Sequence, residues 1–221
     1  MAAANLLERN DSETISAFSY LNDERGLSEE TIKAFELGYM PFGIRKNDGS
    51  LHELAGKIII PIRDAYGDLI AVSSRNWREG KKRQFWHETY AKSLHLFGLS
   101  IAKSSIIKHR KAIVVEGEFD VFSMHEFGLG CTVGTMGTTL KLYQLSLLNR
   151  YAEKIYILFD GDEAGQRAAN KIQEFSDKNY LSGYDVKIII VRLADCLDPD
   201  EFLKQRGKTD MIKLMKASDE S

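Results

Sequence analysis

The second half of the sequence alternates short, largely apolar runs with longer segments of helical pattern. The apolar runs cover residues 112–115, 131–133, 155–159 and 186–191. Strands that are apolar on both faces are typical of parallel sheets whose two faces are covered by helices. The alternation therefore predicts an α/β fold with a central, largely parallel sheet and helices on both of its faces.

The first half has a different pattern and predicts a smaller, mixed α/β lobe. The elements we expect there are helices at 12–21 and from Ser28, and paired strands at 57–62 and 69–74. Residues 75–93 are polar, basic and aromatic without a clear period, so we interpret them as a loop. We place the lobe boundary after residue 108, which assigns 1–108 to the first lobe and 109–221 to the second.

Composition excludes several classes of protein. The 221 residues are 43% hydrophobic, which is enough to bury a core, and they hold 30 basic and 32 acidic side chains. The net charge of −2 excludes a uniformly basic nucleic-acid coat but leaves room for a local basic patch. No apolar run reaches the length of a membrane span, and the first residues do not resemble a secretory signal. We therefore expect a cytoplasmic protein that does not contact membranes.

Carboxylates follow three of the four predicted strands of the second half. They are Glu116 and Asp120, then Asp160 and Asp162, then Asp198 and Asp200. Because the carboxyl ends of parallel strands meet at one edge of the sheet, these acids are expected to gather there. Two like charges about 5 Å apart repel by roughly 3 kcal/mol at an effective dielectric constant near 20.

A divalent cation would offset this repulsion, and ligands that are all oxygen favour Mg²⁺ or Mn²⁺ over Zn²⁺. Such a site performs phosphoryl or nucleotidyl transfer, because the ion stabilises the attacking and leaving oxygens. The competing interpretation is that each acid simply caps a helix. It is strongest for Asp198, which precedes Pro199 and Glu201 in a good capping pattern. The joint occurrence at successive strand ends favours the metal site.

These acidic segments resemble the Toprim domain. VVEGEFD (114–120) and FDGDEAG (159–165) are similar to its two signature motifs, and LDPDEFL (197–203) is similar to the third acidic motif in its primase form. The first half narrows the resemblance to the catalytic core of bacterial and phage primases of the DnaG type. The similar segments there are GLSEETI (26–32), FELGYMP (35–41), IPIRD (60–64), VSSR (72–75) and KSLHLFGL (92–99).

The resemblance implies a DNA primase, which joins ribonucleoside triphosphates on a single-stranded DNA template with Mg²⁺ or Mn²⁺. It makes Glu116, Asp160 and Asp162 the catalytic acids and adds Asp120, Asp198 and Asp200 as metal ligands. It further implies that nucleotide or template is bound by a set of basic residues and a Gly-Thr turn. That set is Arg63, Arg75, either Lys82 or Arg83, Lys92, Gly137 and Thr138.

The resemblance also implies partners. Primases of this type use a zinc-binding module and a replicative helicase, and the cysteine spacing of this sequence does not provide the zinc module. We therefore expect both to be separate partners. Two alternatives stay open at this point. One is a Toprim nuclease, which uses the same metals for hydrolysis, and the other is a non-catalytic nucleic-acid-binding module that keeps the fold.

Overall fold

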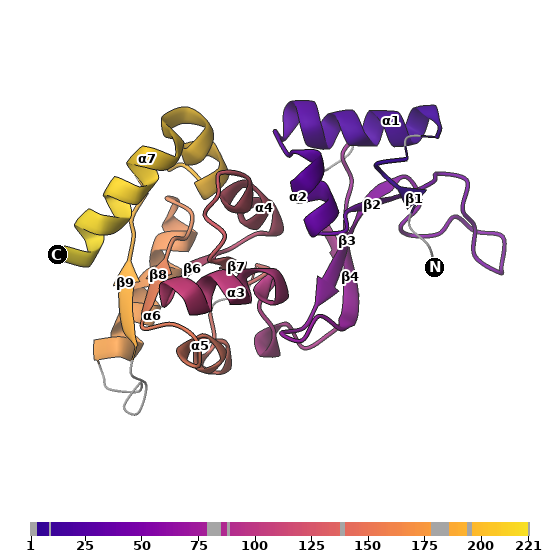
Figure 1. Ribbon diagram of the computed structural model, residues 1–221. Helices are drawn as coiled ribbons and strands as arrows, with labels where there is room; N and C mark the ends of the chain where they lie inside the picture. The colour runs from indigo at the N-terminus through magenta and orange to yellow at the C-terminus, as the bar shows by residue number, and fades with distance from the viewer. Residues whose placement is uncertain are drawn as a thin grey trace. The chain divides into compact units, whose positions relative to one another are not determined.

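The computed structural model describes residues 4–8, 10–78, 85–87, 89–137, 140–177, 186–193 and 196–220. The chain divides into two compact units (Figure 1). The first comprises Met1–Arg63 and Asp68–Tyr90, and the second comprises Asp64–Gly67 and Ala91–Ser221. The boundary after residue 108 stays a prediction of where separate domains divide.

The first unit is built on a five-stranded antiparallel sheet with the order β1-β2-β3-β4-β5. The strands are β1 (Ala4–Asn5), β2 (Gly38–Met40), β3 (Lys57–Arg63), β4 (Leu69–Arg75) and β5 (Phe85–His87). Its helical segments are α1 (Ser12–Ser19), the π-helix η1 (Tyr20–Glu24) and α2 (Glu29–Ala34). The side chains of Asp11 and Ser28 cap α1 and α2, which explains where these helices begin.

Strand β5 corrects the sequence-based interpretation of residues 75–93 as a loop. Its three residues pair with the end of β4, and Trp86 lies opposite Ser74 in the ladder. A strand this short has no detectable alternation of its own. It forms because the edge of β4 offers backbone partners, and local sequence does not reveal such a distant pairing.

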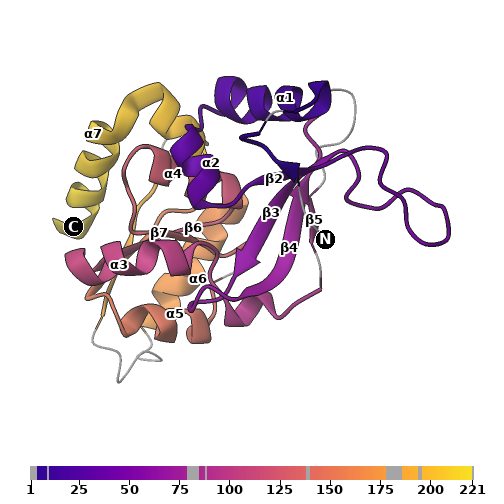
Figure 2. The same cartoon turned by 45° about the vertical axis from the view of Figure 1, so that its right-hand side comes forward.

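The second unit contains a four-stranded sheet, parallel throughout, with the order β7-β6-β8-β9. The strands are β6 (Lys111–Val115), β7 (Thr132–Gly134), β8 (Lys154–Ile157) and β9 (Lys187–Ile190). The helices are η2 (Lys92–Leu94, 3₁₀), α3 (Leu99–His109), α4 (Glu118–Glu126), α5 (Leu142–Asn149), α6 (Glu163–Asp177) and α7 (Pro199–Glu220). Helices flank the sheet, as Figure 2 shows. The predicted parallel α/β architecture is confirmed.

One buried cluster joins the sheet of this unit to its helices. Ala112 and Val114 on β6 and Ile155 and Ile157 on β8 face it, at every second position of each strand. Helical residues complete the cluster: Ala102 and Ile106 from α3, Leu145 and Leu148 from α5, and Ala169 and Ile172 from α6. The apolar strands are therefore fixed in place, and the loops at their carboxyl ends are held on a rigid support.

Helix α7 is interrupted at Gly207, where φ is 75° and ψ is 172°. This backbone conformation is readily adopted only by glycine. The interruption divides α7 into a first part near the predicted acidic segment and a second part that covers another portion of the sheet. Within the described residues, no helix has the length and apolar character needed to cross a lipid bilayer.

Candidate functional site

Glu116 and Asp160 are brought together by two neighbouring parallel strands. Glu116 directly follows β6, and Asp160 lies three residues beyond the end of β8. The backbone N–H of Asp160 donates to Oε1 of Glu116 over 3.4 Å. The carboxyl ends of these two strands therefore place both acids at one edge of the sheet, as the sequence predicted.

Asp120 joins them from the first turn of α4. Its Oδ2 accepts a hydrogen bond from the backbone N–H of Gly117 over 3.0 Å, so the side chain folds back toward the end of β6. Burial raises the pKa of Asp120 well above its usual range, and the negative charges of Asp160, Asp198 and Asp200 raise it further. These four acids thus share one electrostatic environment.

Asp160 is a second carboxylate of this group whose charged form is disfavoured by its surroundings. Burial raises its pKa to about 7, and the charges of Glu116, Asp198 and Asp162 act in the same direction. Its Oδ1 is buried without a hydrogen-bond partner among the described residues. A buried carboxylate oxygen without a donor is costly, and a cation would satisfy it. The residues present therefore fit a hard divalent ion.

The other predicted ligands already have partners of their own. Oδ1 of Asp162 accepts from the N–H of Gly165 over 2.8 Å, and Oδ1 of Asp198 accepts from the N–H of Glu201 over 2.7 Å. Both are helix caps, which agrees with the capping pattern seen in the sequence around Asp198. Asp200 is buried and forms an ion pair with Lys204 over 3.0 Å.

Across the described part of the chain, no three His, Cys, Asp or Glu side chains are arranged to hold a metal ion. The structure thus brings acidic side chains close together, but it does not show them arranged as the coordination shell of a metal ion. The roles of the six acids as metal ligands stay predictions.

Two glycines allow the acidic loops to approach each other. A Cβ atom on Gly165 would lie 2.2 Å from the carbonyl oxygen of Asp160 and 2.9 Å from Oε1 of Glu116. A Cβ atom on Gly161 would lie 3.0 Å from the Cα atom of Cys196 and 3.1 Å from the carbonyl oxygens of Leu193 and Leu197. The sequence contained both glycines within FDGDEAG, yet their role depends on contacts between distant segments, and we assigned them none.

The Gly-Thr turn after β7 adjoins Glu116. The backbone N–H of Gly137 donates to the carbonyl oxygen of Glu116 over 3.2 Å. The ammonium group of Lys92 donates to the carbonyl oxygen of Met136 over 3.3 Å, so this predicted nucleotide-binding cation reaches the same turn. Thr138 lies outside the described residues.

Gln144 fixes the segment that carries Lys92. Its fully buried amide nitrogen donates to the carbonyl oxygens of Lys92 and His95 over 3.1 and 2.7 Å. The residue belongs to α5 and was missed in the sequence, where a glutamine in a helix carries no special signal. It is a positioning residue for Lys92.

The two predicted basic residues of the first unit that the structure describes, Arg63 and Arg75, have internal partners. Arg63 forms an ion pair with Glu36, with a nitrogen–oxygen distance of 2.6 Å. Arg75 is buried, and its Nε donates to the hydroxyl of Tyr20 over 3.2 Å. Lys82 and Arg83 lie outside the described residues. Nucleotide or template binding by these four residues stays a prediction.

Comparison with known proteins connects this geometry to a family. Residues 113–203 match a family described as Toprim-like. A DNA primase of Chlamydia muridarum is 32% identical over 90% of this chain, and the match spans 36% of that protein. The chain thus covers little more than a third of that curated relative's length.

Solved structures agree with these matches. The zinc-binding and RNA polymerase domains of the Aquifex aeolicus primase superpose with a TM-score of 0.78 at 29% identity, covering 95% of this chain and 56% of that one. A DnaG primase catalytic domain bound to single-stranded DNA gives a TM-score of 0.83 at 25% identity, covering 97% of this chain and 77% of that one. The chain therefore contains a Toprim domain and is homologous to the catalytic core of DnaG-type DNA primases.

Proposed function

We propose that this chain synthesises short RNA primers on a single-stranded DNA template in DNA replication. The observation that carries the proposal is the cluster of Glu116, Asp120 and Asp160 at the carboxyl ends of adjacent parallel strands. The homologous proteins are named DNA primases, and a related catalytic domain was solved with single-stranded DNA, which supports the same assignment. Such a protein would work in the cytoplasm of a bacterium or of a phage-infected cell.

In this proposal the acids hold Mg²⁺ or Mn²⁺. The central oxygen ligands come from Glu116, Asp120 and Asp160. The remaining candidate ligands are Asp162, Asp198 and Asp200. The bound ion would neutralise charge on the triphosphate and would favour loss of the proton from the attacking 3′-hydroxyl. The protein's own contribution is positioning: β6 and β8 hold Glu116 and Asp160 side by side, and Asp120 is folded back onto Gly117.

Lys92 supplies a cation on the turn that follows β7. Its contact with Met136 places the ammonium group on the turn that hydrogen-bonds Glu116. We propose that it binds a phosphate of the incoming nucleotide, and that the Gly-Thr turn with Gly137 and Thr138 belongs to the same nucleotide site. Arg63, Arg75 and either Lys82 or Arg83 are proposed to contact nucleotide or template.

A direct test is primer synthesis by the purified chain. Single-stranded DNA, the four ribonucleoside triphosphates and Mn²⁺ are supplied, with and without a primase zinc-binding module and a replicative helicase as proposed partners. The proposal is supported if the wild-type chain makes oligoribonucleotides and the Asp160→Asn variant does not. Template shortening that depends on Asp160 would identify a nuclease instead. DNA binding with neither product, unchanged in Asp160→Asn, would identify a non-catalytic module.

Lys92 permits a sharper second test. In Lys92→Gln, the KM for nucleotide is expected to rise about tenfold, because the loss of one charge-assisted contact to phosphate costs about 1.5 kcal/mol. Metal affinity should stay unchanged, since Lys92 contacts a backbone carbonyl and, among the described residues, no carboxylate. Lys103, which lies on α3 over the rings of Tyr66 and Tyr151, provides a matched control as Lys103→Gln.

A further inference from the structure

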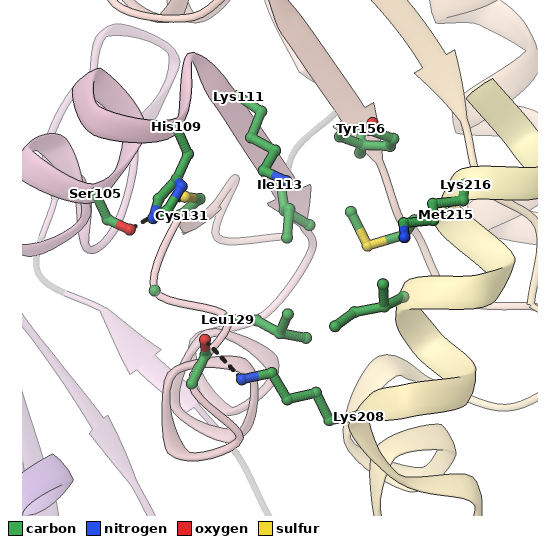
Figure 3. A pocket seen from close by; sticks show the side chains of 13 residues that line it. Ser105, His109, Lys111, Ile113, Leu129, Cys131, Tyr156, Lys208, Met215 and Lys216 are labelled. Atoms are coloured by element: carbon green, nitrogen blue, oxygen red, sulfur yellow. Dashed lines mark hydrogen bonds between the residues drawn. The ribbon is translucent and has the colours of Figure 1, made fainter.

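The second unit contains a cavity of about 230 Å³ that the acidic site does not use. Its walls come from β6, the end of α3, the loop before β7 and the second part of α7 (Figure 3). Lys111 is the first residue of β6, and Cys131 directly precedes β7. The cavity therefore lies toward the amino ends of strands whose carboxyl ends carry the acids.

The sheet provides one wall of this cavity. Lys111 and Ile113 are two residues apart on β6, so their side chains project from the same face. Tyr156 of β8 is the register partner of Ile113 and lies beside it. This pairing gives a wall that is apolar in its centre and carries an ammonium group at its end.

The second part of α7 provides the opposite wall. Four residues of this part line the cavity: Lys208, Ile212, Met215 and Lys216. Their spacings of four, three and one residues place them on one stripe of the helix. The interruption at Gly207 allows this stripe to turn toward the sheet. In Figure 3, the side chain of Met215 faces the same space as those of Ile113 and Leu129.

The ammonium group of Lys208 is held at the edge of the cavity. Its Nζ donates to the carbonyl oxygen of Gly128 over 3.2 Å. A Cβ atom on Gly128 would lie 2.9 Å from that Nζ, and the φ of Gly128 is +70°. Glycine at this position therefore allows the lysine to approach the loop closely.

The cavity is strongly cationic although the whole chain has a net charge of −2. Three lysines and His109 line it, and no acid is among its described lining residues. Within the described part of the chain, neither Lys111 nor Lys216 forms an ion pair or a side-chain hydrogen bond. Asp219, also on α7, is already bound by Lys154 over 2.6 Å and by Lys187 over 2.9 Å.

We propose that this cavity binds a small amphipathic organic anion, in which one carboxylate or phosphate group is attached to an apolar body. The lysines would bind the charged group, while Ile113, Leu129, Ile212 and Met215 would contact the apolar body. The volume equals that of about seven or eight water molecules, which corresponds to a body of two fused rings or less. A bare inorganic ion would leave the apolar walls without contacts.

Methyl NMR of the full chain tests this proposal directly. Methionine labelled with ¹³C at the methyl group reports on Met215 inside the cavity, and Met215→Leu identifies its signal. The probes are 2-naphthoate, 2-naphthyl phosphate and the neutral 2-naphthamide. We expect both anions to shift the Met215 signal in a saturable manner, whereas the amide binds at least tenfold more weakly. The ratio between the two anions shows whether carboxylate or phosphate is preferred.

Charge variants assign the binding to the cavity. We expect each of the variants Lys111→Gln and Lys216→Gln to weaken the binding of 2-naphthoate about threefold, and the double variant to weaken it about tenfold. Lys213→Gln is the matched control, because Lys213 is on the same helix but pairs with Asp210 outside the cavity. The proposal would be overturned if the three Lys→Gln variants weakened the binding of 2-naphthoate equally. It would also be overturned if 2-naphthoate and 2-naphthamide bound equally well, or if the Met215 signal did not shift at millimolar concentrations of the probes.

Discussion

Glu116 and Asp160 lie at the ends of adjacent parallel strands, and the backbone N–H of Asp160 points at Oε1 of Glu116 over 3.4 Å. The Glu116 carboxylate is thus held beside the backbone of Asp160, and burial together with the negative charge of Glu116 raises the pKa of the Asp160 carboxyl. The strand order decides this contact, because β6 and β8 are neighbours although more than thirty residues separate them in the chain. A site of this kind is stable only if the backbone holds its charges against repulsion.

The variant Asp160→Asn is expected to raise the stability of the fold while lowering primer synthesis. Without metal at pH 8, the variant is expected to unfold at a higher temperature, gaining about 2 kcal/mol after allowance for solvent screening, because one buried charge is removed. Primer synthesis should fall at least a hundredfold. Thermal melts and product gels measure the two effects. Asp210→Asn, a change in an exposed acid of α7, serves as the control and should alter neither by more than about 0.5 kcal/mol.

The raised pKa of Asp160 predicts how stability depends on pH. The folded-state pKa of about 7 exceeds the ordinary value of 3.8, so the folded protein binds the proton more tightly than the unfolded chain. This contribution to stability is present at low pH and is lost as pH rises through about 7. Asp120 and Glu116, whose pKa values are also raised, act in the same direction.

Melts at pH 5, 6, 7 and 8 without metal should therefore show wild type losing stability relative to Asp160→Asn as pH rises. Mn²⁺ binding should strengthen over the same range, because metal and proton compete for the carboxylate. A difference between wild type and variant that stays constant across this range would contradict the assignment.

Gly165→Ala should destabilise the acidic site although alanine favours helices. Its Cβ would lie 2.2 Å from the carbonyl oxygen of Asp160 and 2.9 Å from Oε1 of Glu116, so the backbone here would have to shift. We expect a loss of about 2 kcal/mol or more in the free energy of unfolding, measured by urea titration. Gly43→Ala is the matched control, because nothing lies within 4 Å of a Cβ there. Equal stability of the two variants would show that the loops separate freely.

The ion pairs of Asp219 predict that replacing this residue changes the stability of the fold without changing the acidic site. It joins the amino ends of β8 and β9 to α7 through Lys154 and Lys187, and these hydrogen bonds hold the pKa of Asp219 at about 2. Because this pKa lies below the ordinary 3.8, the stabilisation is present above that value and is lost as pH falls toward 2.

Asp219→Asn should therefore lower stability at pH 7 by about 1 kcal/mol, with a smaller effect at high salt. Near pH 2 the difference from wild type should disappear. Metal-dependent activity should remain, because Asp219 sits at the opposite ends of the strands from Glu116 and Asp160. A large loss of activity in a folded Asp219→Asn protein would show that the two ends of the sheet are coupled.

The sequence by itself determined the features that depend on neighbours along the chain. Apolar runs flanked by helical segments specify buried parallel strands, and acids placed directly after those runs must lie at their carboxyl ends. The capping of α7 by Asp198 was readable for the same reason, since the cap, Pro199 and Glu201 are consecutive or nearly so. The family signatures in 114–120 and 159–165 are local in the same sense.

Only the tertiary structure decided the features that depend on segments distant in sequence. Examples are the pairing of β5 with β4, the burial of Arg75 against Tyr20, and the close approach at Gly165. The partnerless oxygen of Asp160 and the cationic cavity under α7 belong to the same group. Burial and register arise from packing between elements, and no short-range pattern of residues encodes which atoms will finally face each other.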